Sequence, residues 1–464
     1  SQPNFLIFFT DQQRWDTLGI NGYPEELTPN LDRLAQRGTF FKEAVTPQPV
    51  CGPCRSCLQT GQYATTAGVW KNGLDMNPNS PKLAELLKQA GYRTSYFGKW
   101  HLSSHAVNRV EAVPESDRAG YEDWLAANAV EICTGPYSVR LWNEQNEEVQ
   151  LPGYRVDAQT DAMIRYLQER AEEPEEHRRP FFCMQSYLQP HHQNTQASYP
   201  APLGYEDLYR DAPIPPDLQA LGGSTAQHWS GYLGMIKRLD EALGRTLDAL
   251  ESTGLADNTV IVFLSDHGCH FKTRNREYKR SPHESSLRIP FVWAGPGWDG
   301  GGEHREAVSL VDFMPSILDC AGVPIPEEVQ GRSLAPLTRN ETAGWPSETF
   351  VQFGDGFLPP GRAVRTQRWK YAVTASEGYK GHAEAPEYIE THLYDLQSDP
   401  YELNNLIGTA PYREVCDDLK SRLLKRMEEA GEPRANILDA PAAHISGQRT
   451  VEYPNTAMAF DEFK

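Results

Sequence analysis

The amino-acid sequence predicts an α/β protein in which a large, mixed but mostly parallel sheet is sandwiched by helices, followed by a smaller C-terminal antiparallel sheet plus helix. Three observations predict this fold. Strand-sized apolar runs alternate with helical patterns over the first 345 residues. Polar residues that can bind ions or transfer protons follow directly after several of these runs. After residue 346, short strand patterns follow one another, which is typical of antiparallel pairing.

The elements of the first part can be placed in order along the chain. Strands are expected at the short apolar or β-branched runs 4–10, 93–97, 180–186, 259–264 and 288–294. Helices are expected at 28–37 and 80–90, introduced by Thr-Pro and Ser-Pro, and at 157–170 and 228–253. This alternation predicts a sheet covered on both faces, with its ligand site at the carboxyl edge of the strands.

A domain boundary is expected near residue 345, in the stretch 336–346, which contains proline, asparagine, threonine and glycine. Residues 1–345 would form the larger domain, and residues 346–464 an α+β subdomain that completes the cleft of the site. In this subdomain strands are expected at 349–353, 363–366 and 369–373, and a helix at 410–430.

The charge of the chain limits its partners. The formal net charge is −19, which argues against nucleic acid or an anionic membrane surface. No apolar run approaches the ~20 residues that a membrane helix needs. Positive charge is nevertheless concentrated in the segment 272–280, which holds Lys272, Arg274, Arg276, Lys279 and Arg280. An anionic substrate is therefore compatible with the acidic composition.

The segment Cys51-Gly-Pro-Cys-Arg-Ser-Cys-Leu-Gln-Thr-Gly61 places a nucleophile, a proline and an arginine in a fixed local order. A helix starting at Pro53 would direct free N–H groups and its positive end toward whatever Cys51 holds. Arg55 adds a planar cation suited to an oxyanion. The three cysteines could instead indicate an iron–sulfur or zinc site, but no fourth thiolate stands at a typical spacing. Cys54 and Cys57 are expected to be small buried residues.

Two predicted strand ends carry groups that suit a divalent cation. Asp11 and Gln12 follow the first strand, and Asp266 and His267 follow the strand at 259–264. Carboxylate-rich oxygen sites favour Ca²⁺ or Mg²⁺. A single aspartate at a strand end is more often a cap or turn residue, but two acidic strand ends around a candidate nucleophile favour a metal site.

Cys51, Pro53 and Arg55, followed by Leu58 and Thr60-Gly61, resemble the signature of the type I sulfatases, a formylglycine-dependent family of the alkaline phosphatase-like superfamily. The resemblance implies that a formylglycine-generating enzyme oxidises Cys51 to formylglycine, whose hydrate attacks sulfur. It also implies an alkaline phosphatase-like fold in which residues 1–345 are the catalytic domain.

Other segments resemble the same family in the same order. They are Gly98-Lys99-Trp100-His101, Pro190-His191 and the stretches 279–290, 362–371 and 393–406. The catalytic residues that the resemblance implies are Cys51, Arg55, Lys99, His101, His191 and Lys279. The implied metal ligands are Asp11, Gln12, Cys51, Asp266 and His267, with Ca²⁺ as the expected ion and Mg²⁺ as the alternative. Gln12 departs from the commoner aspartate, and His283 stands where the family commonly has tyrosine.

The resemblance implies hydrolysis of a sulfate monoester to an alcohol and sulfate, with a sulfated carbohydrate as the expected substrate and aryl sulfates also accepted. Sugar rings and neighbouring sulfates are expected to contact Trp100, His192, Arg274 and Arg276. A phosphonate monoester or phosphodiester hydrolase of the same superfamily is an alternative. A non-catalytic binder of sulfated glycans, with Cys51 left as a thiol, is another, and a redox or iron–sulfur protein is a third.

The chain begins at Ser1 without methionine, so a signal peptide could have been removed before it. The expected location is periplasmic or secreted, without a membrane span. The oligomeric state and the choice between exo- and endo-action stay open.

Overall fold

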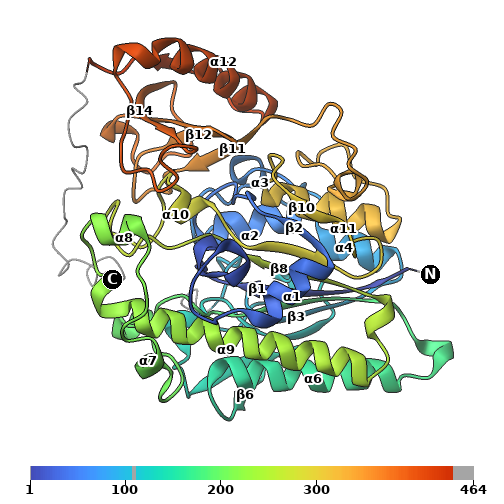
Figure 1. The fold of residues 1–464 in the computed structure, drawn as a ribbon. Helices are drawn as coiled ribbons and strands as arrows, with labels where there is room; N and C mark the ends of the chain where they lie inside the picture. The colour runs from blue at the N-terminus through green and yellow to red at the C-terminus, as the bar shows by residue number, and fades with distance from the viewer. Residues whose placement is uncertain (1, 107–110, 443–464) are drawn as a thin grey trace.

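The computed structural model describes residues 2–106 and 111–442, and the larger part of this described chain is built on a ten-stranded sheet (Figure 1). Its strands are β1 (Asn4–Thr10), β2 (Thr39–Phe41), β3 (Arg93–Lys99), β4 (Asp123–Ala127), β5 (Val139–Asn143), β6 (Glu148–Leu151), β7 (Phe181–Ser186), β8 (Thr259–Ser265), β9 (Phe291–Ala294) and β10 (Gly302–His304). Their order across the sheet is β10-β2-β9-β8-β1-β7-β3-β4-β5-β6.

The centre of the sheet is parallel and its flanks contain antiparallel pairs. β8, β1, β7, β3 and β4 pair in parallel, whereas β9 and β5 join them antiparallel. Every residue of β1 is buried, and its side chains alternate between two cores, with Phe5 and Ile7 in one and Leu6 and Phe8 in the other. The predicted fold class is confirmed. The outer strands were not predicted because β2 and β10 have three residues each and β6 alternates exposed with half-buried residues.

Helices cover both faces of this sheet. One face carries α1 (Pro29–Arg37), α6 (Arg155–Glu172) and α9 (Thr225–Ser252), and α6 and α9 run side by side in Figure 1. The other face carries α2 (Cys51–Thr60), α4 (Leu83–Gln89) and α11 (Phe313–Ala321). The short helices of this part are α3 (Ala64–Ala67), α5 (Val130–Cys133), α7 (Tyr205–Leu208), α8 (Pro216–Ala220) and α10 (Glu284–Leu287).

Most predicted elements are confirmed, with boundaries that differ by three residues or fewer. β3 continues to Lys99, and the strand expected from residue 288 begins only at Phe291. The helix expected to start at Pro53 begins two residues earlier, at Cys51. Proline is tolerated there because the N–H groups of the first turn have no partner within the helix.

The C-terminal part contains a second, five-stranded sheet, drawn above the larger one in Figure 1. Its strands, in spatial order, are β11 (Glu348–Phe353), β12 (Gly361–Thr366), β13 (Trp369–Thr374), β14 (Glu387–Asp395) and β15 (Asn436–Leu438). The sheet is antiparallel, as predicted, apart from the added parallel strand β15. α12 (Arg413–Glu429) packs on it and confirms the helix predicted at 410–430. The end of the predicted subdomain, beyond residue 442, lies outside the described residues.

The two parts are joined by an apolar cluster and a buried ion network. Leu287 of the larger part packs in one cluster with Val351 of the second sheet. Beside it, Arg365 donates two hydrogen bonds of 3.0 Å to the carboxylate of Glu284, and Lys370 Nζ lies 3.0 Å from the same carboxylate. Since α10 directly follows the cationic segment 272–280, the second sheet contacts the chain immediately after this segment.

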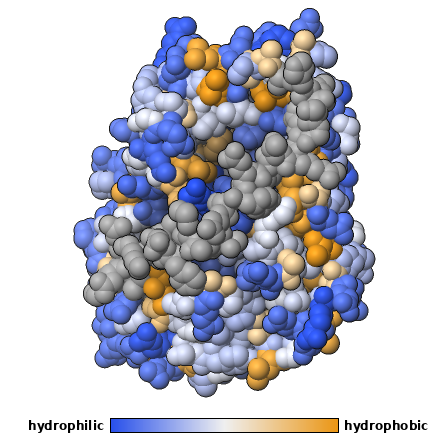
Figure 2. Space-filling view, turned by 90° about the vertical axis from the view of Figure 1, so that its left-hand side faces the viewer, coloured by the Kyte–Doolittle hydropathy of each residue, from blue (hydrophilic) through white to orange (hydrophobic). Residues whose placement is uncertain are grey.

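The surface is consistent with an acidic, charged chain. The face shown in Figure 2 is hydrophilic over most of its area, and its hydrophobic residues form smaller groups. Of the helices in the described part of the chain, none combines the length and the apolar composition that crossing a bilayer requires.

Candidate active site and metal centre

The polar residues that follow β1 and β8 lie side by side because these strands are parallel neighbours. Thr10 pairs with Ser265 at the strand ends, so Asp11 and Asp266 leave the sheet at the same edge. Both carboxylates are fully buried. The backbone N–H of Gln12 donates to Asp266 Oδ1 at 3.1 Å and ties the two strand ends together.

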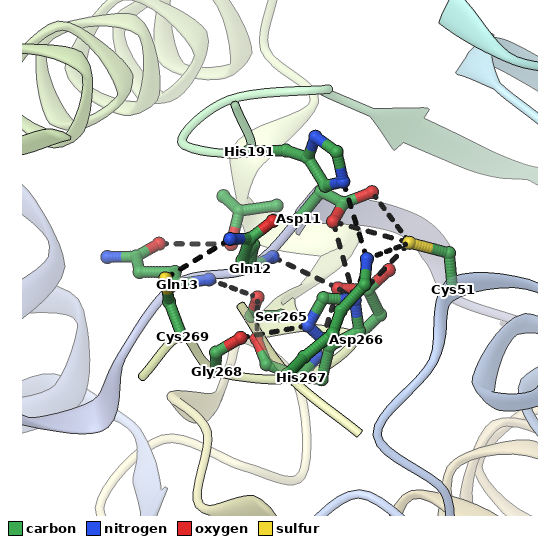
Figure 3. Close-up of polar contacts among 12 residues, drawn as sticks. Asp11, Gln12, Gln13, Cys51, His191, Ser265, Asp266, His267, Gly268 and Cys269 are labelled. Atoms are coloured by element: carbon green, nitrogen blue, oxygen red, sulfur yellow. Dashed lines mark hydrogen bonds and ion pairs between the residues drawn. The ribbon is translucent and has the colours of Figure 1, made fainter. Parts of the chain in front are cut away.

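Cys51 is the first residue of α2, and its Sγ is the point on which distant segments converge (Figure 3). Lys279 Nζ lies 3.0 Å from this sulfur, His267 Nε2 3.3 Å and Lys99 Nζ 3.5 Å. Both carboxylate oxygens of Asp11 are 3.6 Å away. The structure therefore brings together residues from three strand ends, one helix start and the cationic segment.

The charges around Cys51 favour an anion at its position. Burial raises the pKa of the Cys51 thiol, but the ammonium groups of Lys279 and Lys99 outweigh this effect and hold that pKa well below its usual value. Burial lowers the pKa of Lys99, but Asp11 and the Cys51 thiolate reverse this and raise it. Both lysines are therefore charged when the site is empty of substrate.

Lys99 ends β3 and is held by two carboxylates. Its Nζ lies 2.8 Å from Asp11 Oδ2 and 2.9 Å from Glu131 Oε1. His101 follows with a left-handed φ of 62°, and its Nδ1 is 3.6 Å from the same Glu131 oxygen. Burial would raise the pKa of Glu131, but Lys99 and His101 lower it to about 2. Sequence analysis missed Glu131 because it lies in the four-residue helix α5 and belongs to no recognisable pattern.

Arg55 lies one turn into α2 and is almost fully buried. Its Nη2 donates to Asp11 Oδ2 at 3.0 Å and to Asp266 Oδ2 at 3.2 Å. Its Nη1 donates to the Lys99 carbonyl and to Ser186 Oγ, both at 2.9 Å. Four hydrogen bonds of this guanidinium are thus made within the protein, and they connect the ends of β1, β3, β7 and β8. Ser186, another residue that sequence analysis missed, ends β7.

Two histidines lie just beyond β7. His191 Nδ1 is 2.6 Å from the His192 carbonyl, which assigns the proton of the neutral ring to Nδ1. His191 Nε2 lies 3.3 Å from Lys279 Nζ and can accept its hydrogen bond. Burial and the Lys279 ammonium lower the pKa of His191. The His192 ring stacks on His191 and on Tyr278, with ring centroids 4.2 and 4.3 Å apart.

Asp11, Cys51, Asp266 and His267 form a buried cluster whose candidate ligand atoms all lie within 4.8 Å of one another. His267 Nδ1 bonds to the Gly268 carbonyl at 2.9 Å, which leaves the lone pair of Nε2 on the side of Cys51. Burial and the adjacent Asp11 raise the pKa of Asp266 to about 6. A divalent cation would offset this repulsion between two carboxylates, so the donor set fits such an ion.

Gln12 adds an amide to this donor set. Its Nε2 donates to Tyr199 Oη and to Cys269 Sγ, both at 3.1 Å (Figure 3 labels Gln12 and Cys269). Its Oε1 is buried and has no hydrogen-bond partner among the described residues. A buried unsatisfied oxygen costs roughly 1–3 kcal/mol, and a cation would satisfy it. The residues present therefore fit a metal site that includes Gln12.

Of the other residues expected to contact the substrate, Trp100 lies in the core. Trp100 is fully buried and packs edge-to-face on Tyr96 and Trp124, so the expectation that it contacts a sugar is wrong. Alternation explains the error, because Trp100 points into the core from between Lys99 and His101. Arg274 donates to the carbonyls of residues 401 and 402 and ties the cationic segment to the C-terminal part. Arg276 is exposed.

Cys54 and Cys57 are fully buried free thiols of α2. They belong to different apolar clusters, and burial raises the pKa of both. The prediction that they are small buried residues is confirmed. In the described residues, neither belongs to a group of side chains that could hold a metal ion.

Known proteins resemble this chain over most of its length. Residues 3–323 match the family described as Sulfatase, and residues 277–429 match the family described as N-sulphoglucosamine sulphohydrolase, C-terminal. An ulvan-active sulfatase of Formosa agariphila is 31% identical over 445 residues, which cover 93% of this chain and 82% of the relative. An N-acetylglucosamine-6-O-sulfatase of Bacteroides thetaiotaomicron is 25% identical over 91% of this chain and 86% of its own length.

A solved structure from work on the metabolism of multiple glycosaminoglycans by Bacteroides thetaiotaomicron has the same fold. Its TM-score is 0.81 at 24% identity, with 93% of this chain and 97% of that chain covered. This similarity shows the fold, and the cations around the Cys51 thiol suit an anionic substrate. The match over residues 3–323 and the relative at 31% identity show that the chain belongs to the sulfatase family. It is a sulfuric ester hydrolase.

Proposed function

We propose that this sulfatase hydrolyses sulfate monoesters of carbohydrates, with a formylglycine made from Cys51 and with Ca²⁺ as the metal ion. One observation supports this most strongly: the Cys51 sulfur lies within 3.6 Å of two ammonium groups, an imidazole and a carboxylate. A sulfate ester carries negative charge, so a nucleophile can approach its sulfur only where cations offset the repulsion. The similar ulvan-active and N-acetylglucosamine-6-O-sulfatases support a sulfated sugar as the substrate.

Lysine, histidine and arginine side chains would have separate roles around the ester. Lys99 and Lys279 would bind the sulfate oxygens, since both ammonium groups flank Cys51 Sγ. His191 Nε2 accepts a hydrogen bond from the Lys279 ammonium, so His191 would relay a proton from Lys279 through Nε2 to the leaving alcohol oxygen. His101 lies within hydrogen-bonding reach of Cys51 and would orient the modified side chain. Arg55 acts as a positioning residue, because its hydrogen bonds go to Asp11, Asp266 and two strand ends.

A metal cation and the formylglycine residue would complete the chemistry. Asp11, Gln12, Asp266 and His267 would hold the cation beside residue 51, where it would neutralise sulfate oxygens and favour ionisation of the nucleophile. Hydrated formylglycine would supply one hydroxyl to attack sulfur and a second to expel sulfate. A cysteine thiol has neither of these hydroxyl groups, so this mechanism requires oxidation of Cys51.

The C-terminal part is proposed to be a subdomain that begins near residue 346 and completes the cleft. Its contacts with the cationic segment support a role in completing the cleft, since Arg274 binds the carbonyls of residues 401 and 402 and Arg280 pairs with Asp355 at 2.9 Å. A formylglycine-generating enzyme would be the maturation partner. A periplasmic or secreted location would give access to extracellular glycans.

The test is sulfate release, measured by ion chromatography, from a panel of singly sulfated sugars and one aryl sulfate, with matched phosphate and phosphonate esters. The protein would be co-expressed with a formylglycine-generating enzyme, and mass spectrometry of the Cys51 peptide would report conversion. We expect sulfate release that is lost in Cys51→Ala. Release of phosphate or phosphonate alone would support the alternative hydrolase. If protein with Cys51 fully converted to formylglycine released no product from any ester, the result would contradict a hydrolytic function.

A further inference from the structure

The segment 70–72 is fixed beside the nucleophile. Asn72 Oδ1 accepts a hydrogen bond of 2.9 Å from the backbone N–H of Gly52, the residue that follows Cys51. The fit is close, because a Cβ atom at Gly52 would lie 2.7 Å from that oxygen and 3.3 Å from the His101 carbonyl. Trp70 and Lys71 therefore stand next to the start of α2, and both are only half-buried.

Next to the segment 70–72, the start of α2 is also flanked by the cationic segment and the connection between β11 and β12. We call the segment 70–72 and these flanking parts the two walls of the region. Arg280 follows Lys279, and its N–H donates to the carbonyl of Pro49, two residues before Cys51. The Arg280 guanidinium lies over the Phe357 ring at 5.0 Å. The two walls touch each other, because a Cβ atom at Gly356 would lie 3.8 Å from Lys71 and 3.9 Å from Trp70.

These walls form a rim cluster with cationic and aromatic side chains: Trp70, Lys71, Arg280, Phe357 and Lys380. Lys71 Nζ is 4.9 Å from the centre of the Trp70 ring, and Lys380 Nζ is 6.0 Å from that of Phe357. Within the described residues, neither lysine forms an ion pair with a carboxylate. In a chain with a net charge of −19, these two ammonium groups give this cluster a local excess of positive charge.

Cation–π contacts of exposed lysines are weak and could be incidental for a single pair. Here four chain segments bring two half-buried rings and three cations to one place, and two of these segments bond directly to residues 49 and 52. Arg280 is paired with Asp355, so the two lysines supply the net positive charge of the cluster. An aromatic face offers a flat apolar surface to the C–H side of a sugar ring, while ammonium and guanidinium groups bind an anionic substituent. This combination suits a charged saccharide better than a neutral one.

We infer that the rim cluster is a subsite for the sugar residue next to the sulfated one, and that this neighbour carries its own anionic group. The substrate class is then a polyanionic oligosaccharide, whose neighbouring anion is a second sulfate or a uronate carboxylate. The ring stacks on Trp70 or Phe357, and Lys71 and Lys380 bind the anion. The inference rests on the proposed function, since it places the scissile sulfate ester at Cys51.

Three disaccharides with the same sulfated residue and the same linkage test the subsite. Their neighbouring residue carries a second sulfate, a uronate carboxylate or no charge. For the double variant Lys71→Gln/Lys380→Gln, the ratio of kcat/KM for a charged over the uncharged neighbour is expected to fall about tenfold. The matched control Lys88→Gln/Lys425→Gln removes the same charge from exposed positions on α4 and α12 and should keep the wild-type ratio.

A binding experiment decides the subsite without turnover. In the Cys51→Ala background, titration calorimetry is expected to show weaker binding of the charged disaccharides when both rim lysines are replaced, with a smaller dependence on salt. Equal affinity with and without the two lysines would overturn the inference. An unchanged kcat/KM ratio in the double variant would do the same. Absence of sulfate release from every substrate, including the aryl sulfate, would instead contradict the proposed function.

Discussion

Lys279 Nζ lies 3.0 Å from Cys51 Sγ although 228 residues separate the two in the chain. The loop between β8 and α10 holds Lys279 in this place. His270 Nε2 bonds to the Lys279 carbonyl at 2.9 Å, and the next residue, Arg280, bonds to Pro49. The position of this ammonium group therefore depends on two backbone contacts that flank it.

Replacing Lys279 with alanine is expected to lower kcat roughly 10²- to 10³-fold, the usual cost of removing one group that stabilises charge in a transition state. Steady-state kinetics with an aryl sulfate would measure it. Lys425→Ala, on the exposed side of α12, serves as a control for the loss of one positive charge. A change of less than twofold in Lys279→Ala would show that this ammonium group does not contact the reacting sulfate.

Gln12 is expected to be a metal ligand through its unpartnered Oε1. Gln12→Ala should weaken Ca²⁺ binding to the metal-free protein about 10- to 100-fold, measured by titration calorimetry. Gln12→Asp should bind more tightly than Gln12→Ala because a carboxylate restores an oxygen ligand.

Tyr199→Phe removes one of the two acceptors that hold the Gln12 amide nitrogen, so a smaller loss of Ca²⁺ affinity is expected for it. If Gln12→Ala bound Ca²⁺ as well as the wild type, the amide would have to be removed from the ligand set.

The Glu284 carboxylate is expected to be the main polar link between the two sheets. It is buried and bound by Arg365 and Lys370. Glu284→Gln therefore removes one of the two carboxylates that pair with each of these buried cations, and leaves Glu43 with Arg365 and Glu402 with Lys370. A loss of about 3–5 kcal/mol in the free energy of unfolding is expected, measured by denaturant titration. Glu303→Gln removes a carboxylate from an exposed pair with Lys42 and should change stability by less than about 1 kcal/mol. Equal effects of the two substitutions would contradict the proposed link.

Histidines at the junction of the two parts should make the fold sensitive to acid. His283 Nε2 lies 3.1 Å from Tyr394 Oη, and its ring packs edge-on to His392. Burial, with Arg274 and Lys370 nearby, lowers the pKa of His283 well below its usual value and that of His392 to about 3. An unfolded histidine has a pKa near ~6.5.

Below pH ~6.5 these histidines therefore become protonated in the unfolded chain but stay neutral in the folded protein. Their contribution to stability is complete above this pH and is lost as the pH falls toward their folded-state values. We expect His392→Gln to reduce the fall in unfolding free energy between pH 6.5 and 5 by up to ~1.4 kcal/mol per pH unit. Denaturant titrations at several pH values measure it, and parallel slopes for variant and wild type would refute the effect.

Local sequence was sufficient for the central elements and for placing several candidate site residues directly after strands. A strand of fully buried residues such as β1 is an uninterrupted apolar run, and the polar residue that ends it, Asp11, is adjacent in the chain. The same reasoning located Asp266 after β8. The order of Cys51, Pro53 and Arg55 is likewise a local feature, and helix α2 begins within two residues of the predicted start.

Tertiary structure alone decided which of these residues meet and which additional ones join them. Glu131 reaches Lys99, Ser186 reaches Arg55 and Tyr199 reaches Gln12, in each case from a segment whose own sequence has no distinguishing pattern. Backbone conformation and burial follow from short-range preferences that a sequence displays directly. Contacts between side chains depend on strand order, register and loop paths, which arise only when segments hundreds of residues apart pack together.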